Sequence, residues 1–190
     1  MSRWESDARG RLEKATLELF RERGYERATV AEISERAGLT KRTFFRHFAD
    51  KREVLFGGQE TLHNLFTDAI VGAPDSATPI DAIGAALRAA AVMFPPERRE
   101  LARQRQIIIA ANSELREREM LKRASLAEAM VGALRHRGVT DPTASLAAEL
   151  GGLAFRTAVV RWVDPANEQE FAELAREALL DLQTATAALA

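Results

Sequence analysis

Apolar residues recur along this chain with the period of an α-helix almost throughout. The first stripe has three- and four-residue spacing and consists of Leu12, Ala15, Leu19 and Phe20. It predicts a helix that ends at Gly24, a residue suited to the position after a helix. No segment shows the sustained period-two alternation that is typical of a strand. The pattern therefore predicts an all-α fold.

Capping residues mark the next two helices. Thr29 stands where the N-cap of a second helix is expected, and Gly38 closes that helix. Thr40 is placed to cap a third helix that runs through Phe48. We therefore expect three short helices within residues 9–49.

Six longer helices are expected in the rest of the chain. Asp50 is placed to cap a helix that starts at Lys51 and ends at the break GAPDSATP. Proline or a capping residue then marks the starts of helices expected over residues 78–94, 95–112, 114–136 and 141–162, and from residue 167 onward. The total is about nine helices.

The segment KRTFFRHFADK, residues 41–51, combines positive charge with three phenylalanines. Phe44 and Phe48 are four residues apart, so they share one helix face and can pack on the helices behind it. The remaining faces carry Lys41, Arg42, Thr43, Phe45, Arg46 and His47. Two short helices joined at a Gly-Leu turn, with such a basic front, are typical of a helix-turn-helix that binds DNA.

Physical roles can be assigned within this front. Phosphate contacts are expected from Thr29, Thr40, His47 and Lys51. Arg42 suits a bidentate contact with guanine, and the methyl group of Thr43 suits a thymine methyl. A single lysine or arginine on a helix surface is usually only solvated, so the prediction depends on the combination of turn, caps and basic face.

The distribution of charge and the composition support a DNA-binding role for the first quarter of the chain. The chain has a net charge of −1, but residues 1–52 hold 13 Lys and Arg against 9 Asp and Glu, whereas the rest holds 14 against 19. A basic first quarter favours a polyanionic partner. The absence of cysteine excludes disulfides and thiolate sites, and three scattered histidines argue against a metal cluster. We expect a cytoplasmic protein with no cofactor and no membrane segment.

The segment GYERATVAEISERAGLTKRTFFRHFADKREVLF resembles the N-terminal DNA-binding domain of the TetR family of bacterial transcriptional regulators. The resemblance covers roughly residues 9–56 and implies a homodimer on a palindromic operator, with a C-terminal domain that binds a small molecule and releases DNA. It implies a helix-turn-helix domain over residues 1–50 and a ligand-binding and dimerisation domain over residues 51–190. Phe45 departs from the tyrosine common in the family, so a contact with sugar or a thymine methyl replaces the usual phosphate hydrogen bond.

Candidate residues for the C-terminal domain follow from helical spacing. A stripe of mostly small residues that allows close helix approach in a dimer contains Ala144, Ala148, Gly151, Gly152 and Phe155. A complementary apolar seam contains Phe171, Leu174, Ala178 and Leu182. Packing within one chain is the alternative for both sets. Polar groups and neighbouring apolar residues suggest a ligand site at Gln59, His63, Phe66, Met93, Phe94, Gln106 and Asn112, although each alone also fits an ordinary core position.

These observations favour a ligand-responsive dimeric repressor. The alternative is a DNA-binding regulator or architectural protein without a small-molecule ligand. An all-α enzyme would need catalytic carboxylates such as Glu114 and Glu117, but these occupy ordinary positions on a charged helix, with no glycine loop, triad or metal spacing nearby. We therefore do not expect an enzyme.

Overall fold

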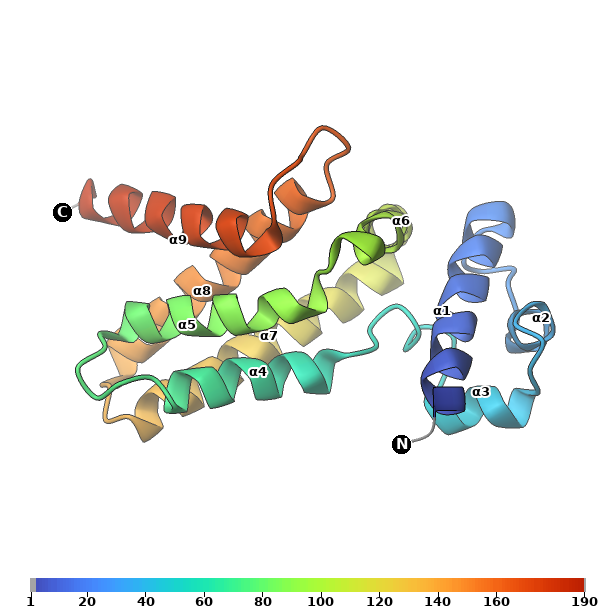
Figure 1. Cartoon of the computed structure of the whole chain (residues 1–190), viewed down its shortest axis with the longest axis horizontal. Coiled ribbons are helices and arrows are strands. Elements are labelled where there is room, and N and C mark those ends of the chain that lie inside the picture. Colours follow the sequence, from blue (N-terminus) through green and yellow to red (C-terminus); the bar gives the residue numbers. More distant parts are fainter. Residues whose placement is uncertain (1–2, 190) are drawn as a thin grey trace. The chain divides into compact units, whose positions relative to one another are not determined.

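The computed structural model describes the backbone of residues 3–189 and the side chains of residues 8–189. Over this range the chain has no strand, and the all-α prediction is confirmed. The helices are α1 Arg3–Arg23, α2 Val30–Arg36, α3 Lys41–His47, α4 Gln59–Val71, α5 Pro79–Ala90, α6 Arg99–Ala111, α7 Ser113–His136, α8 Asp141–Trp162 and α9 Phe171–Ala187 (Figure 1). Two short 3₁₀ helices, η1 Ala91–Met93 and η2 Pro96–Arg98, lie between α5 and α6.

The described residues form two compact units. The N-terminal unit contains the chain up to Gly58 together with Glu100–Glu119, and the C-terminal unit contains Gln59–Arg99 and the chain from Met120 onward. The division falls inside α6 and α7, so each of these helices contributes to both units. The N-terminal unit thus includes residues beyond position 50, where the sequence suggested a boundary.

An apolar core holds the N-terminal unit together. The predicted inner faces of the first three helices are buried, with Leu12, Ile33 and Phe44 inaccessible to solvent. Ile108 of α6 and Leu115 of α7 belong to the same core. These two contributions explain why residues 100–119 fold with the helix-turn-helix.

The ends of α2 and α3 follow the predicted caps. The Thr29 hydroxyl accepts a hydrogen bond from the Glu32 N–H, and the Glu32 carboxylate accepts one from the Thr29 N–H. The Thr40 hydroxyl accepts from the Thr43 N–H at 3.1 Å. Gly38 has a φ of 64°, a conformation that other residues rarely adopt, so the turn after α2 needs glycine at this position.

The helix expected from Lys51 begins eight residues later than predicted. Asp50 does accept hydrogen bonds from two backbone N–H groups that follow it, as a cap would. The turn does not propagate, because Gly58 has a φ of 86°, outside the helical region. Residues 51–58 form turns instead, and α4 starts at Gln59.

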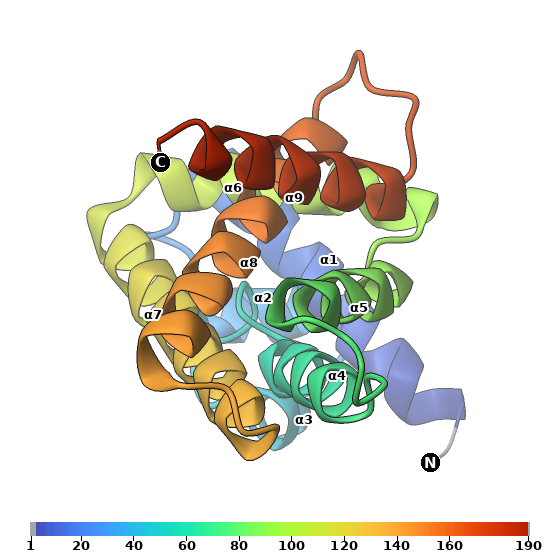
Figure 2. The same ribbon diagram turned by 90° about the vertical axis from the view of Figure 1, so that its left-hand side faces the viewer.

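Within the C-terminal unit, α4 packs along α5, and α8 lies against α5 and α9 (Figures 1 and 2). The core receives large side chains from different helices, including Phe66, Ile83, Met130 and Trp162. The Arg137 guanidinium, just after α7, donates to backbone carbonyls at the end of α4. These contacts hold the ends of α4 and α7 together.

Proline and local capping shift three of the remaining helix ends. The helix expected over residues 78–94 changes to a 3₁₀ turn after Ala90, and the next one becomes α-helical only at Arg99. Proline lacks an N–H and restricts the residue before it, which accounts for the break at Pro95 and Pro96. The N-cap of α9 is Glu170 rather than the expected Asn167. In the described part of the chain, no helix is both long and apolar enough to cross a lipid bilayer.

Candidate nucleic-acid interface

Burial separates the two sides of α3 as predicted. Phe44 is fully buried and Phe48 nearly so, and their ring centroids lie 5.7 Å apart. Phe45 is 56% exposed and meets Phe44 edge to face, with a centroid distance of 5.4 Å. The buried rings anchor α3 to the core. The backbone that carries the exposed side chains is therefore held in a fixed position.

Positive charge lies unpaired on this exposed side of α3. Lys41, Arg42 and Arg46 are exposed. No carboxylate in the described part of the chain forms a salt bridge with any of them. A surface whose cations have no internal partner suits an external anion.

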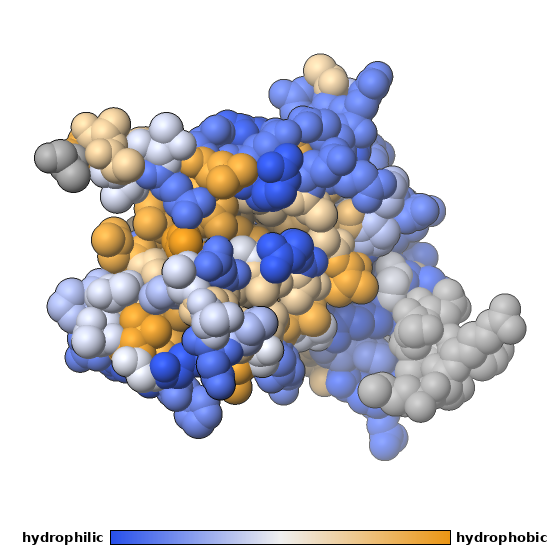
Figure 3. Space-filling view, turned by 60° about the vertical axis from the view of Figure 1, so that its left-hand side comes forward, coloured by the Kyte–Doolittle hydropathy of each residue, from blue (hydrophilic) through white to orange (hydrophobic). Residues whose placement is uncertain are grey.

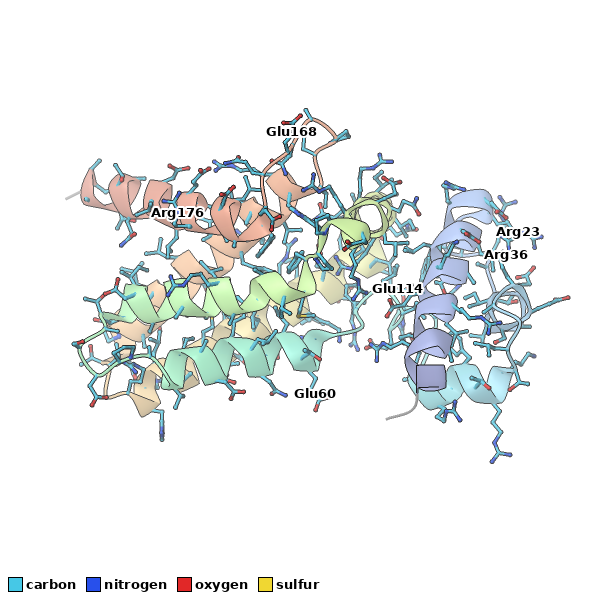
Figure 4. The ribbon with its side chains drawn as sticks, in the orientation of Figure 1. Arg23, Arg36, Glu60, Glu114, Glu168 and Arg176 are labelled. Atoms are coloured by element: carbon cyan, nitrogen blue, oxygen red, sulfur yellow. The ribbon has the colours of Figure 1, made fainter. Side chains whose placement is uncertain are left out.

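Two arginines of the unit outside α3 are neutralised within the protein. Arg23 pairs with Glu32, and Arg36 pairs with Glu22 at 2.7 Å, close to each other on the same side of the unit (Figure 4). The hydrogen bond from Arg36 lowers the pKa of Glu22, so this pair is fully ionised at neutral pH. The contrast supports α3 as the face that meets DNA.

The remaining predicted contacts are less open. The hydroxyl groups of Thr29 and Thr40 bond within the protein, to Glu32 at 2.8 Å and to Thr43 at 3.0 Å. His47 is half-buried, and its Nε2 is enclosed without a hydrogen-bond partner among the described residues. Phosphate contacts from Thr29, Thr40 and His47 stay predictions.

Lys51 does not present its charge to the surface as expected. Its ammonium group donates to the carbonyls of Tyr25, Glu26 and Ala28 at 2.7, 3.1 and 3.1 Å. It also lies 4.4 Å from the centroid of the Tyr25 ring, a cation–π geometry. All three N–H donors are used, so Lys51 holds the loop between α1 and α2 and has no free donor for phosphate.

Lys51→Met is expected to lower the free energy of unfolding by about 1–3 kcal/mol, because partly buried carbonyls lose a charged donor. Lys41→Met, on the unpaired front, should leave stability within about 0.5 kcal/mol. It should instead reduce the slope of log affinity for DNA against log salt by about one per subunit. Urea unfolding and fluorescence anisotropy across a salt series measure both. A stable Lys51→Met protein with a reduced slope would restore Lys51 as a phosphate contact.

A polar cluster joins α7 to the helix-turn-helix inside the N-terminal unit. Glu114 accepts a hydrogen bond from Arg52 at 2.7 Å and one from the Tyr25 hydroxyl at 3.4 Å (Figure 4). Arg52 also forms a salt bridge with Asp50, which lies two residues after the buried Phe48. The start of α7 therefore braces both the α1–α2 loop and the segment that follows α3. Sequence spacing gave no signal for this cluster, because its members are far apart in the chain.

Tyr25 is the only tyrosine in the chain, so its ionisation can be followed directly. Burial first, and the charge of Glu114 second, raise the pKa of Tyr25 to about 12. An unfolded tyrosine titrates near 10. The contribution of the neutral Tyr25 hydroxyl to the free energy of unfolding is therefore fully present below about pH 10. It is lost as the pH rises towards 12.

Tyrosinate absorbance is expected to show one midpoint near pH 12 in the folded protein. Glu114→Gln should lower this midpoint only part of the way to the unfolded value, since a neutral amide does not repel the phenolate but burial still raises the pKa. Tyr25→Phe should remove the loss of stability that begins above about pH 10. A midpoint near 10 in the folded parent protein would show that Tyr25 is not held as described.

The predicted ligand residues do not all fall in one unit. Gln59, His63, Phe66, Met93 and Phe94 belong to the C-terminal unit. Gln106 and Asn112 belong to the N-terminal unit, where the Asn112 amide donates to the Ile108 carbonyl at 2.6 Å and closes the end of α6. The seven-residue ligand site therefore stays a prediction, with its members divided between the two units.

Aromatic rings contact two of the remaining candidates, Phe66 and Phe94. Phe94 stacks on Phe171 with a centroid distance of 4.0 Å and an interplanar angle of 9°. Phe155 meets Phe66, Phe94 and Phe171 edge to face, and Phe94 meets Trp162 in the same way. We call these five residues the ring cluster. Sequence reasoning missed Trp162 and assigned Phe155 and Phe171 to a dimer interface.

Two polar candidates lie together at the start of α4. The Gln59 amide nitrogen is 3.4 Å from His63 Nε2 and 3.4 Å from the Lys122 carbonyl. Burial, and then the charge of Lys122, lower the pKa of His63. His63 is therefore neutral at pH 7 and can accept or donate a hydrogen bond.

The predicted dimer residues are mostly interior residues of one chain. Six of the nine are buried within the C-terminal unit: Ala144, Ala148, Gly151, Phe171, Leu174 and Ala178. A Cβ added at Gly151 would come within 2.7 Å of Ile83, whereas one at Gly152 would meet nothing within 4 Å. The six buried residues therefore pack within the chain, whereas the assignment of Gly152, Phe155 and Leu182 to a dimer contact stays a prediction.

Another stripe on α8 is apolar and open. Leu146 and Val160 are 55% and 59% exposed, and Leu153, midway between them, is half-buried. The seven-residue spacing puts these three on one side of α8, which we call the α8 stripe. Apolar side chains also gather on the face of the protein seen in Figure 3, between hydrophilic areas above and below. Exposed apolar surface of this kind is typical of protein contacts.

Comparisons with known proteins agree with this geometry. Residues 12–56 match the sequence pattern of bacterial regulatory proteins of the tetR family. The HTH-type transcriptional regulator TcmR of Streptomyces glaucescens is 40% identical over 81 residues, which make up 43% of this chain and only 36% of that protein. The match thus spans about a third of that relative's length.

Solved structures resemble the chain over most of its length. FadR of Bacillus subtilis, in complex with stearoyl-CoA, gives a TM-score of 0.59 at 18% identity, over 89% of this chain and 94% of that chain. FadR of Thermus thermophilus, a TetR-family repressor in complex with lauroyl-CoA, gives a TM-score of 0.53 at 23% identity, over 90% of this chain and 91% of that chain. Both likenesses show a shared fold.

Proposed function

Because this chain carries the DNA-binding domain of the TetR family of bacterial regulatory proteins, we propose that it is a dimeric repressor released from a palindromic operator by a small molecule. One observation carries the DNA-binding part. The exposed side of α3 holds three cations without an internal partner, on a helix anchored by two buried rings. A regulator of this kind acts on the chromosome, hence in the cytoplasm.

The proposed contacts with DNA are of two kinds: one contact recognises a base, and the others bind phosphates and position the protein. Arg42, exposed and unpaired, is proposed to bind a guanine edge with both guanidinium nitrogens. Lys41 and Arg46 are proposed to contact phosphates on either side, together with the N-terminal turns at Thr29 and Thr40 and with His47. Phosphate contacts set affinity and its dependence on salt, and the base contact sets the preferred sequence.

Dimerisation is proposed to use the α8 stripe. Leu146, Leu153 and Val160 expose apolar surface along one side of a 22-residue helix. A second copy that brings the same stripe against it would bury this surface around a two-fold axis. Two-fold symmetry would present two copies of α3 to DNA, which is why a palindromic site is expected.

The effector is proposed to be amphipathic and to bind in the C-terminal unit. The ring cluster offers apolar contact, and Gln59 and His63 of the same unit offer hydrogen bonds. The FadR proteins that share the fold hold lauroyl-CoA and stearoyl-CoA, which makes a long-chain acyl-CoA the first compound to test. A regulator without a ligand is the second candidate, favoured by the close stacking of Phe94 on Phe171.

The test begins with DNA that flanks the protein's own coding region. Fluorescence anisotropy should detect a duplex that binds far more tightly than random DNA of the same length. Adding lauroyl-CoA should then release the duplex and raise the melting temperature, because a ligand of the folded state stabilises it by mass action. Specific DNA binding without any response across a broad ligand screen would support the second candidate. Equal affinity for every duplex would overturn the proposal.

A further inference from the structure

Phe45 is an unusual residue for the surface on which it lies. Among the large hydrophobic residues that are exposed in the described part of the chain, it alone is aromatic. Its ring is 56% exposed and leans edge to face on the buried Phe44. One side of the ring therefore packs on Phe44, and the other side is an apolar surface exposed to solvent.

The neighbours of Phe45 are cationic. Arg42 and Arg46 are exposed on the same helix, and Lys41 lies one turn earlier on the side of Phe45. The whole helix has seven residues, so it is only about 10 Å long, comparable with the roughly 12 Å width of the major groove. If these cations meet DNA as proposed, the Phe45 ring meets it too.

The chemistry of the groove limits what such a ring can recognise. Phenylalanine has no hydroxyl and forms no hydrogen bond with a base edge or a phosphate. The edges of the bases in the major groove carry mostly hydrogen-bonding groups, and the largest apolar group among them is the C5-methyl group of thymine. Sugar carbons are also apolar, but they are identical at every nucleotide and give no preference for sequence.

We propose that Phe45 selects a thymine in each operator half-site by burying its C5-methyl group against the exposed ring. This inference rests on the proposed function, and it names one base that the operator must contain. Thr43 is the weaker candidate for the same contact, because its side chain is half-buried and its hydroxyl bonds with Thr40 at 3.0 Å. The ring carries no charge, so the contact adds affinity without adding to the dependence on salt.

The test is a double-mutant cycle that combines a substitution at Phe45 with the removal of a thymine methyl group from the operator. In the operator, each thymine is replaced singly by deoxyuridine, which differs only by the loss of the methyl. A single replacement at the contacted position should weaken binding to the parent protein about fourfold, the equivalent of about 0.8 kcal/mol for one buried methyl group. Phe45→Ala should bind the original operator more weakly and show no further loss at that position.

Two variants serve as controls. Ile107→Ala removes another side chain of the N-terminal unit that is also 56% exposed, and it should keep the full fourfold response to deoxyuridine. Phe45→Tyr keeps the ring and should keep the response as well. If every deoxyuridine replacement affects the parent and Phe45→Ala equally, the ring contacts sugar or nothing, and the proposal is overturned. A protein that binds all duplexes alike would instead refute the proposed function itself.

Discussion

Replacing Arg42 with alanine is expected to raise the dissociation constant for the operator by about 5- to 150-fold for each subunit that loses its bidentate contact with guanine, the equivalent of roughly 1–3 kcal/mol per contact. Arg42 is exposed and has no salt-bridge partner among the described residues, so its side chain does not stabilise the fold. The loss should therefore fall on binding alone. Preference should relax at one base pair per half-site, while affinity for random DNA changes little.

Arg46 offers a matched control on the next turn of α3. It is the same residue type, equally without a salt-bridge partner, and is assigned to phosphate. Arg46→Ala should weaken operator and random duplexes alike and lower the slope of log affinity against log salt by about one per subunit. Anisotropy titrations over a salt series, with single base-pair changes in the operator, compare the two variants. Identical base preferences and identical slopes for both would show that the assignment of α3 is wrong.

Local chemistry made much of the fold predictable. Thr40 and Gly38 bound the turn between α2 and α3 through a hydroxyl cap and a positive φ, and both effects depend on residues no more than a few positions away. The same applies to α8, whose predicted bounds coincide with Asp141–Trp162. The prediction of a helix from Lys51 was wrong, because Gly57 and Gly58 follow the Asp50 cap closely and Gly58 adopts a positive φ.

Contacts between distant segments could not be predicted in this way. Arg52 and Glu114 are separated by 62 positions, and Lys51 reaches the Tyr25 carbonyl across 26. Each residue alone looks like an ordinary charged surface residue. Only the folded chain shows that all three donors of Lys51 bind carbonyls of the α1–α2 loop. It also shows that the start of α7 forms hydrogen bonds with the helix-turn-helix.

Periodicity also cannot tell which neighbour covers an apolar face. The small residues of α8, such as Gly151, and the larger Leu146 both recur at helical intervals. In the structure Ile83 and Met130 of the same chain cover Gly151, whereas Leu146 remains open. The small Gly151 thus serves close packing within the chain, whereas the larger Leu146 stays exposed.

Leu146→Glu combined with Val160→Glu is expected to convert the dimer into a monomer. Both side chains are more than half exposed, so the substitutions should leave the folded chain intact. In a two-fold contact the α8 stripe meets its own copy, so the variant would bring four carboxylates into an apolar interface. Desolvation and like-charge repulsion of this kind cost several kcal/mol.

Mass by sedimentation equilibrium, at micromolar protein, distinguishes the two states. The matched control is Met120→Glu combined with Leu121→Glu, which adds the same charge at α7 residues that are 65% and 59% exposed and lie outside the α8 stripe. This control should remain a dimer and bind the operator normally. The α8 variant should lose most of its preference for a palindrome over a single half-site, because its two recognition helices are no longer linked. An unchanged mass in the α8 variant would place the dimer contact elsewhere on the C-terminal unit, and a monomeric parent protein would remove the dimer from the proposal altogether.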